Sequence, residues 1–129
     1  MILLSITVVV VGTININTIR ESRYKIVIPK RQSDINHLRI AFVADLHIDK
    51  NLKLSFVKQF VRKVNALNPD ILLYGGDIIE GHWDENVSAE IIETLKSIKT
   101  KYGQYGILGN HEHYGSDNPG RFIPWLTSS

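Results

Sequence analysis

The feature that most constrains the fold of this chain is an alternation of short apolar runs with amphipathic segments between residues 38 and 108. Runs at 38–44, 71–74 and 104–108 have the length of strands, and the first is almost continuously apolar, which is typical of a parallel strand covered on both faces. Residues 52–67 repeat apolar side chains at helical spacing, and a second helix is expected to start at Ser88. The sequence therefore predicts an α/β fold built on a parallel βαβαβ unit with right-handed crossovers.

Residues at the ends of these segments support the assignment. Asn68 and Pro69 separate the first predicted helix from the second strand. Lysines gather toward the end of the second helix, where they interact favourably with the helix dipole, and Gly103 is expected to close it.

Composition limits the classes of protein that fit. The chain has 129 residues and no cysteine, so one modest domain without disulfides is expected, and any metal site must use oxygen and nitrogen ligands. The formal net charge is +2, from 15 basic and 13 acidic residues. This balance differs from the dense basic surface of a nucleic-acid-binding protein, so no nucleic-acid partner is expected.

Residues 1–19 contain the most apolar part of the chain, MILLSITVVVV. We interpret this segment as a membrane anchor or signal-anchor remnant, although the run is shorter than the roughly 20 apolar residues that span a bilayer. A buried β-strand is the alternative. The basic residues that follow would suit an anionic headgroup surface or a solvated linker: Arg20, Arg23, Lys25, Lys30 and Arg31.

Residues 20–37 are expected to form a strand and a linker ahead of the main domain at 38–129. Apolar Tyr24, Ile26 and Ile28 alternate with their neighbours at the period of a strand, and Pro29 would end it. We expect this strand to lie at the edge of a sheet.

Three polar motifs follow the three strands of the predicted βαβαβ unit. They are Asp45-x-His47, Gly75-Gly76-Asp77 and the run Gly109-Asn110-His111-Glu112. In parallel sheets the loops at the carboxyl ends of the strands converge and bind ligands. Each motif alone is compatible with an ordinary turn, but their common position predicts one shared site.

Together these motifs resemble the calcineurin-like metallophosphoesterase superfamily, over residues 38–114, and the hydrophobic start is similar to its bacterial membrane-associated branch. The resemblance covers only the N-terminal part of such proteins. It implies the N-terminal βαβαβ half of a four-layer α/β/β/α sandwich and the activity of a phosphoester hydrolase, acting on phosphodiesters or phosphomonoesters through a metal-activated hydroxide. A membrane anchor would fit a lipid-linked substrate.

The resemblance also implies two divalent metal ions, Mn, Fe or Zn, held by oxygen and nitrogen ligands. Asp45 and His47 would bind the first ion, Asp77 would bridge the two, and Asn110 would bind the second ion and a phosphate oxygen. A bridging anion offsets the repulsion between ions about 3.5 to 4 Å apart.

The family pattern makes His111 the catalytic group that protonates or stabilises the leaving alkoxide. Glu112 would orient the His111 imidazole, or would act only as a helix-start or turn carboxylate. Substrate contacts are expected from Asn110, His82 and His113. Trp83, Asp84 and Tyr114 lie beside these residues in the sequence and are further candidates.

The family completes its metal site with later histidines, and no histidine follows His113 in this sequence. We therefore expect a truncated gene or fragment with little activity alone, ending in an unfinished helix at 121–126. The alternative is a non-catalytic, membrane-tethered binding module. A Rossmann nucleotide-binding domain is disfavoured because Gly75-Gly76-Asp77 lacks the required glycine spacing.

Overall fold

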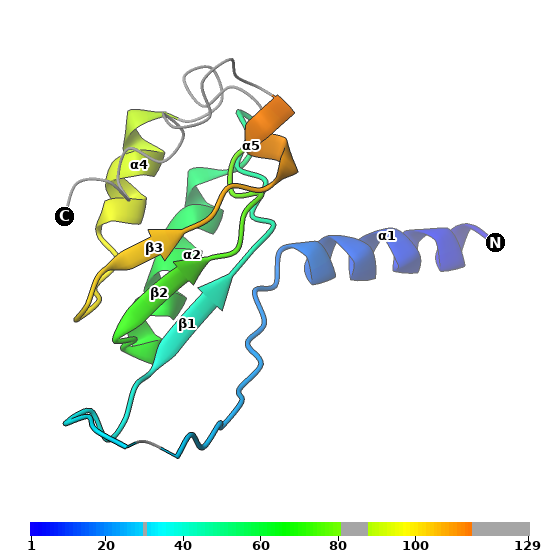
Figure 1. The fold of residues 1–129 in the computed structure, drawn as a ribbon. Coiled ribbons are helices and arrows are strands. Elements are labelled where there is room, and N and C mark those ends of the chain that lie inside the picture. The colour runs from blue at the N-terminus through cyan, green and yellow to red at the C-terminus, as the bar shows by residue number, and fades with distance from the viewer. Residues whose placement is uncertain (30, 81–87, 115–129) are drawn as a thin grey trace. The chain divides into compact units, whose positions relative to one another are not determined.

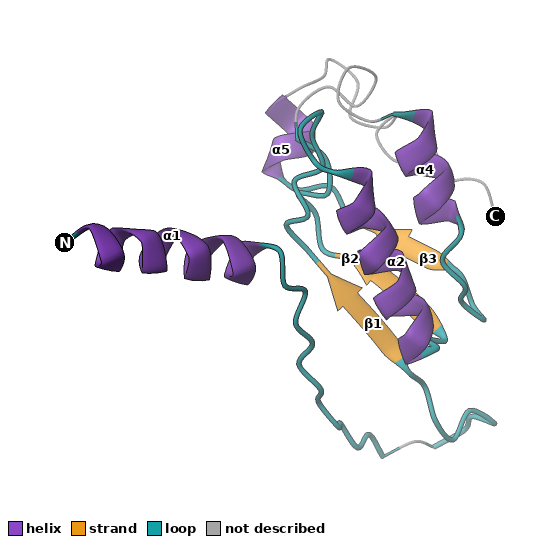
Figure 2. Ribbon diagram, turned by 180° about the vertical axis from the view of Figure 1, so that it is seen from behind, coloured by secondary structure: helices purple, strands orange, loops and turns teal. Residues whose placement is uncertain are grey.

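The computed structural model describes residues 1–29, 31–80 and 88–114 and consists of two compact units, Met1–Asp34 and Ile35–Ser129. Figures 1 and 2 show the helices and strands of each unit.

The first unit begins with helix α1 (Ile2–Ile16), so the apolar start is a helix and the alternative of a buried strand is wrong. Hydroxyl groups of Thr7 and Thr13 donate to the carbonyls of Leu3 and Val9, at 2.9 and 2.8 Å, which satisfies these polar side chains within the helix. The helix has 15 residues, a length of about 22 Å against a hydrocarbon core of about 30 Å. Within the described parts of the chain, no helix is both long enough and apolar enough to cross a membrane.

The strand expected at residues 20–30 is a wrong prediction for its described part, because residues 20–29 have no regular secondary structure. Alternation of side chains predicts a strand only where a neighbouring strand can satisfy the backbone groups. The described backbone of this segment is in no sheet, and Arg23 bonds locally instead, donating to the Glu21 carboxylate at 2.6 and 2.9 Å.

The second unit contains the predicted parallel sheet. Its strands are β1 (Ile40–Val43), β2 (Ile71–Tyr74) and β3 (Gln104–Gly106), in the order β1-β2-β3. Both neighbouring pairs are parallel, with Phe42 opposite Leu73 and Leu73 opposite Tyr105. The α/β class and the βαβαβ order are therefore confirmed.

Helices α2 (Leu54–Leu67) and α4 (Ala89–Lys96) pack against each other and cover one face of the sheet (Figure 2). Side chains from both helices and from β2 are buried between these layers and form the core: Val57, Phe60, Val61, Val64, Ile91, Leu95, Leu72 and Tyr74. Side chains on the opposite face are exposed, among them Ile40 and Phe42 of β1 and Tyr105 of β3. Helix α4 begins as predicted, because the Ser88 hydroxyl accepts a hydrogen bond from the Ile91 amide at 3.3 Å.

The end of α4 differs from the prediction. The helix stops at Lys96, and Gly103 instead precedes β3 with φ of +100°. A glycine is suited to this left-handed conformation, so Gly103 turns the chain into the strand and does not close the helix.

Candidate metal centre

The loops that follow β1 and β2 run side by side beyond the ends of the strands. The amide of Asp45 donates to the Gly76 carbonyl at 3.1 Å, and the amide of His47 donates to the Asp77 carbonyl at 3.0 Å. Ile48 and Ile79 then form an isolated parallel bridge, and both side chains are buried. The two loops are therefore anchored by backbone bonds and by apolar side chains on each side of the polar residues.

Three of the predicted ligands have left-handed backbone conformations. The φ angles are +54° at Asp45, +44° at His47 and +51° at Asp77. Such conformations are unfavourable for residues other than glycine, and in folded proteins they are concentrated at functional sites. The strain indicates that the loops are held in a geometry that serves their side chains.

Glycines allow the loops after β2 and β3 to approach closely. A Cβ atom at Gly76 would lie 2.8 Å from the Gly109 backbone, and one at Gly109 would overlap the Asp77 carboxylate. Gly76 also has φ of +93°. The glycines of the second and third motifs therefore bring Asp77 next to the start of α5 (Asn110–Tyr114).

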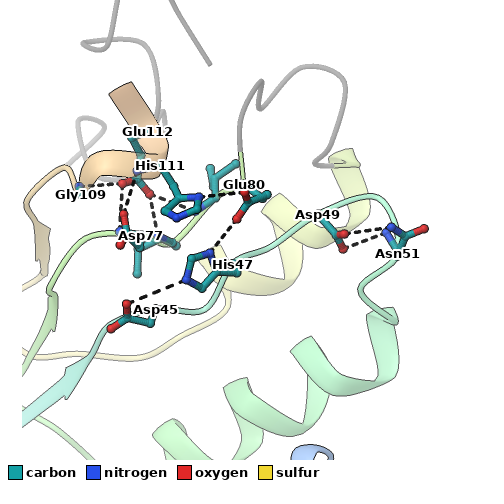
Figure 3. A network of polar contacts seen from close by, with 11 residues as sticks. Asp45, His47, Asp49, Asn51, Asp77, Glu80, Gly109, His111 and Glu112 are labelled. Atoms are coloured by element: carbon teal, nitrogen blue, oxygen red, sulfur yellow. Dashed lines mark hydrogen bonds and ion pairs between the residues drawn. The ribbon is translucent and has the colours of Figure 1, made fainter. Parts of the chain in front are cut away.

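Asp45, His47 and Asp77 form the first cluster of possible metal ligands (Figure 3). One ligand atom from each residue lies within 4.8 Å of the others, and Nε2 of His47 lies 3.9 Å from an oxygen of Asp45. Two carboxylates and an imidazole suit a divalent ion such as Mn²⁺ or Zn²⁺. This donor set fits the metal site that the sequence predicted.

His47, Glu80 and His111 form a second cluster. One Glu80 oxygen lies 2.7 Å from Nδ1 of His47, and the other lies 2.8 Å from Nδ1 of His111 (Figure 3). The two imidazole rings meet edge to face, with centroids 4.5 Å apart. One carboxylate thus contacts both histidines and leaves Nε2 of each ring available for another partner.

The charges of this cluster change the proton affinities of its members. The hydrogen bond to Glu80 raises the pKa of His47 above its ordinary value, against the opposing effect of burial, with the carboxylates of Asp77 and Asp45 adding to the rise. Hydrogen bonds from His47 and His111 lower the pKa of Glu80 below its ordinary value. Both shifts favour a charged Glu80 beside the imidazoles.

Glu80 is the residue that the sequence analysis missed. Its position three residues after Asp77 was the available signal. The orienting role predicted for Glu112 is wrong, because the His111 ring contacts Glu80, whereas the Glu112 carboxylate is buried against backbone amides.

Two of the remaining candidate site residues lie in α5. Asn110 begins α5 and is exposed, as is His113 in the same helix. His82, Trp83 and Asp84, and the predicted helix at 121–126, lie outside the described residues.

The sequence profile of the calcineurin-like phosphoesterase family matches residues 38–128, and the chain therefore belongs to that family. No solved structure matches the chain.

Three relatives illustrate the similarity. A "transmembrane protein with metallophosphoesterase domain" from Danio rerio is 32% identical over 76% of this chain and 22% of its own length. The UDP-2,3-diacylglucosamine pyrophosphatase LpxG of Chlamydia trachomatis is 32% identical over 75% of this chain and 29% of its own length. An uncharacterized metallophosphoesterase of Campylobacter jejuni is 33% identical over 70% of this chain and 23% of its own length. The matched region thus spans less than a third of each of these relatives.

Proposed function

We propose that this chain supplies the metal-binding loops of a metal-dependent phosphoester hydrolase. The observation that carries the proposal is the meeting of Asp45, His47 and Asp77 at the carboxyl edge of the sheet, with His111 beside them. Membership of the calcineurin-like phosphoesterase family supports the same reaction class.

The ligand assignment follows the three motifs. Asp45, His47 and Asp77 would hold a first divalent ion, and Asp77 and Asn110 would hold a second, with Asn110 also contacting a substrate oxygen. The ions are Mn, Fe or Zn, to which carboxylate, imidazole and amide groups are suited. When bound, they supply Lewis-acid polarisation of the phosphoryl group and lower the pKa of water.

The side chains of this chain have separate tasks around that centre. The contact between Nδ1 of His47 and Glu80 leaves Nε2 directed toward Asp45 for ligation. The contact between Nδ1 of His111 and the same carboxylate fixes the second ring, whose Nε2 donates a proton to the departing alkoxide. His113 and His82 are candidates for substrate contacts beyond the reacting group.

We also propose a lipid-linked phosphoester as the substrate class and a membrane surface as the location. Two observations support this proposal: the names of the relatives, which include a diacylglucosamine pyrophosphatase and a transmembrane protein, and the apolar helix α1. The basic residues Arg20, Arg23 and Lys25 after α1 would favour an anionic headgroup region.

The number of ligands bears on the activity of the 129-residue chain itself. The assignment gives the first ion Asp45, His47 and Asp77, and gives the second ion only Asp77 and Asn110. An ion with two protein ligands is weakly held, so this chain alone should hydrolyse phosphoesters slowly.

The test uses the full-length gene product, with metal content measured beside hydrolysis of an aryl phosphodiester. Removal of metal by EDTA should abolish hydrolysis, and Mn²⁺ should restore it. Replacing His111 with alanine should lower turnover roughly 10²- to 10⁴-fold, the usual contribution of a general acid, while metal content stays near that of the wild type. His37→Ala, at an exposed position in the linker, is the matched control.

Three results would contradict this proposal. Full hydrolysis in the presence of EDTA would exclude a metal-dependent reaction. Loss of metal in His111→Ala would make His111 a ligand instead of a proton donor. A protein that binds metal at Asp45 and Asp77 but hydrolyses no phosphoester with Mn²⁺, Fe²⁺ or Zn²⁺ would favour a binding module.

A further inference from the structure

Glu112 is the one charged side chain that is fully buried among the residues the structure describes. It lies in α5, directly after His111, yet its carboxylate points away from the imidazole cluster toward the loop that follows β2 (Figure 3). A buried carboxylate is strongly unfavourable unless its oxygens accept hydrogen bonds. Its partners therefore show what this residue does.

Those partners are four backbone amides from two loops. One oxygen accepts from the amides of Ile78 at 2.6 Å and Ile79 at 3.0 Å. The other accepts from the amides of Asp77 at 2.9 Å and Gly109 at 2.7 Å. Three consecutive amides, from Asp77 to Ile79, thus converge on one carboxylate, and such an arrangement of N–H groups is a strong anion site.

The contact is reciprocated by Asp77. While the Glu112 side chain accepts from the Asp77 backbone, the Asp77 side chain accepts from the backbone amide of His111 at 2.9 Å. The two loops therefore exchange carboxylate-to-amide bonds in both directions. These bonds fix both the left-handed backbone of Asp77, with φ of +51°, and the rotation of its carboxylate.

We propose that Glu112 is a positioning residue, which sets the metal affinity of the site by holding Asp77 in its ligating conformation. We call the Glu112 carboxylate and its four amide partners the amide network. The inference rests on the proposed function only in taking Asp77 as a metal ligand. It assigns Glu112 no contact with substrate and no proton transfer.

Glutamine at position 112 cannot reproduce the amide network. Each carboxylate oxygen accepts two N–H groups, whereas a glutamine side chain offers one oxygen, and its NH₂ group would face two further donors. The substitution preserves shape and volume and removes half of the accepting capacity. Its effect should therefore be seen in the position of Asp77 more than in core packing.

The experiment compares Glu112→Gln with two control variants in the 129-residue chain in detergent micelles. Glu90→Gln makes the same chemical change at an exposed helix position. Leu95→Ala destabilises the core and changes no charged or polar group at the metal site. Amide proton shifts of Ile78 and Ile79 report on the network, and titration with Mn²⁺ reports on affinity.

Glu112→Gln should move the amide signals of Ile78 and Ile79 and weaken Mn²⁺ binding roughly 10- to 100-fold, the range found for groups that orient metal ligands. Both controls should keep the wild-type Mn²⁺ affinity, Leu95→Ala doing so despite its lower melting temperature. A merely structural Glu112 would instead lower stability without this selective loss of affinity.

Each other outcome has a definite meaning. Unchanged amide signals in Glu112→Gln would overturn the amide network. Moved signals with unchanged Mn²⁺ affinity would overturn the positioning role. If the wild-type chain binds no Mn²⁺, the assignment of Asp77 as a ligand in this chain fails and the positioning role falls with it, while the amide signals still decide the network. If Glu112→Gln does not fold, Glu112→Asp, which keeps the charge but shortens the reach, is judged by the same two measurements.

Discussion

The helix-covered face of the sheet and the loops at its carboxyl edge are stabilised in different ways. On the covered face, side chains such as Val61, Leu72 and Leu95 pack against one another, and burial of apolar surface supplies the stability. The helices there have ordinary ends, as the Ser88 cap illustrates.

The loops at the carboxyl edge depend on polar contacts between segments distant in sequence. Glu112 accepts from the loop after β2, and Glu80 contacts His47 and His111. Asp45, His47 and Asp77 hold left-handed conformations there. Carboxylates that would repel one another without a ligand are thus gathered at one edge, beside imidazoles that form hydrogen bonds with one of them.

This contrast indicates that apolar burial in the core stabilises the fold. The left-handed loop conformations at the carboxyl edge lower that stability and hold the polar side chains in position. Substitutions in the two regions should therefore separate two measurements, the free energy of unfolding and the affinity for metal.

Asp77→Ala should abolish tight metal binding, because it removes the proposed bridging carboxylate and the acceptor of the His111 amide. The loss should exceed the roughly 10- to 100-fold change expected for a group that only orients a ligand. Metal analysis after dialysis measures the effect, with Asp70→Ala at the opposite end of β2 as the control. Wild-type metal content in Asp77→Ala would refute the bridging role and place the ligands elsewhere.

Leu95→Ala should lower the free energy of unfolding by about 2 to 5 kcal/mol, because it leaves a cavity in the core between α4 and the sheet. Metal affinity of the folded fraction should stay at the wild-type value. Denaturant unfolding and metal titration below the transition together measure the two quantities. A parallel fall in affinity would show that the core and the edge are not separable.

Glu80→Gln should weaken metal binding roughly 10- to 100-fold while leaving the core intact. The glutamine oxygen can accept from Nδ1 of one histidine, but its NH₂ group requires the other ring to carry its proton on Nε2. Where that ring is His47, the proton on Nε2 would block ligation, and in either orientation the neutral amide supports the basicity of the His47 imidazole less than the Glu80 carboxylate does. Metal titration tests this against Glu90→Gln, and equal affinities of the two variants would exclude the orienting role of Glu80.

Ser88→Ala should have the smallest effect, a loss of about 1 kcal/mol in stability from the missing cap of α4. Metal affinity should not change, because the Ser88 hydroxyl bonds to an amide of its own helix. Thermal unfolding measures the loss. A change in stability near zero would mean that solvent satisfies the Ile91 amide as well as Ser88 does.

Much of the fold was predictable because it depends on local patterns. The apolar run at 71–74 coincides with β2, and the helical spacing that ends at Leu67 coincides with the end of α2. The strand expected at 20–30 shows the limit of such patterns, since its described residues 20–29 remain irregular. Alternation records which side chains share a face and carries no information about a pairing partner.

The sequence by itself determined the parallel βαβαβ order and the edge at which its three polar motifs meet, because periodicity and the polarity of parallel strands fix both. Only the tertiary structure decided which carboxylate forms hydrogen bonds with which histidine. Glu80 lies 31 residues from His111, and Glu112 lies 34 residues from Ile78, so their contacts depend on how closely the loops pack. Glu112 adjoins His111 in sequence, but its carboxylate accepts from backbone amides of the loop after β2. Buried N–H groups in that loop require an acceptor, and no local sequence pattern shows which residue supplies it.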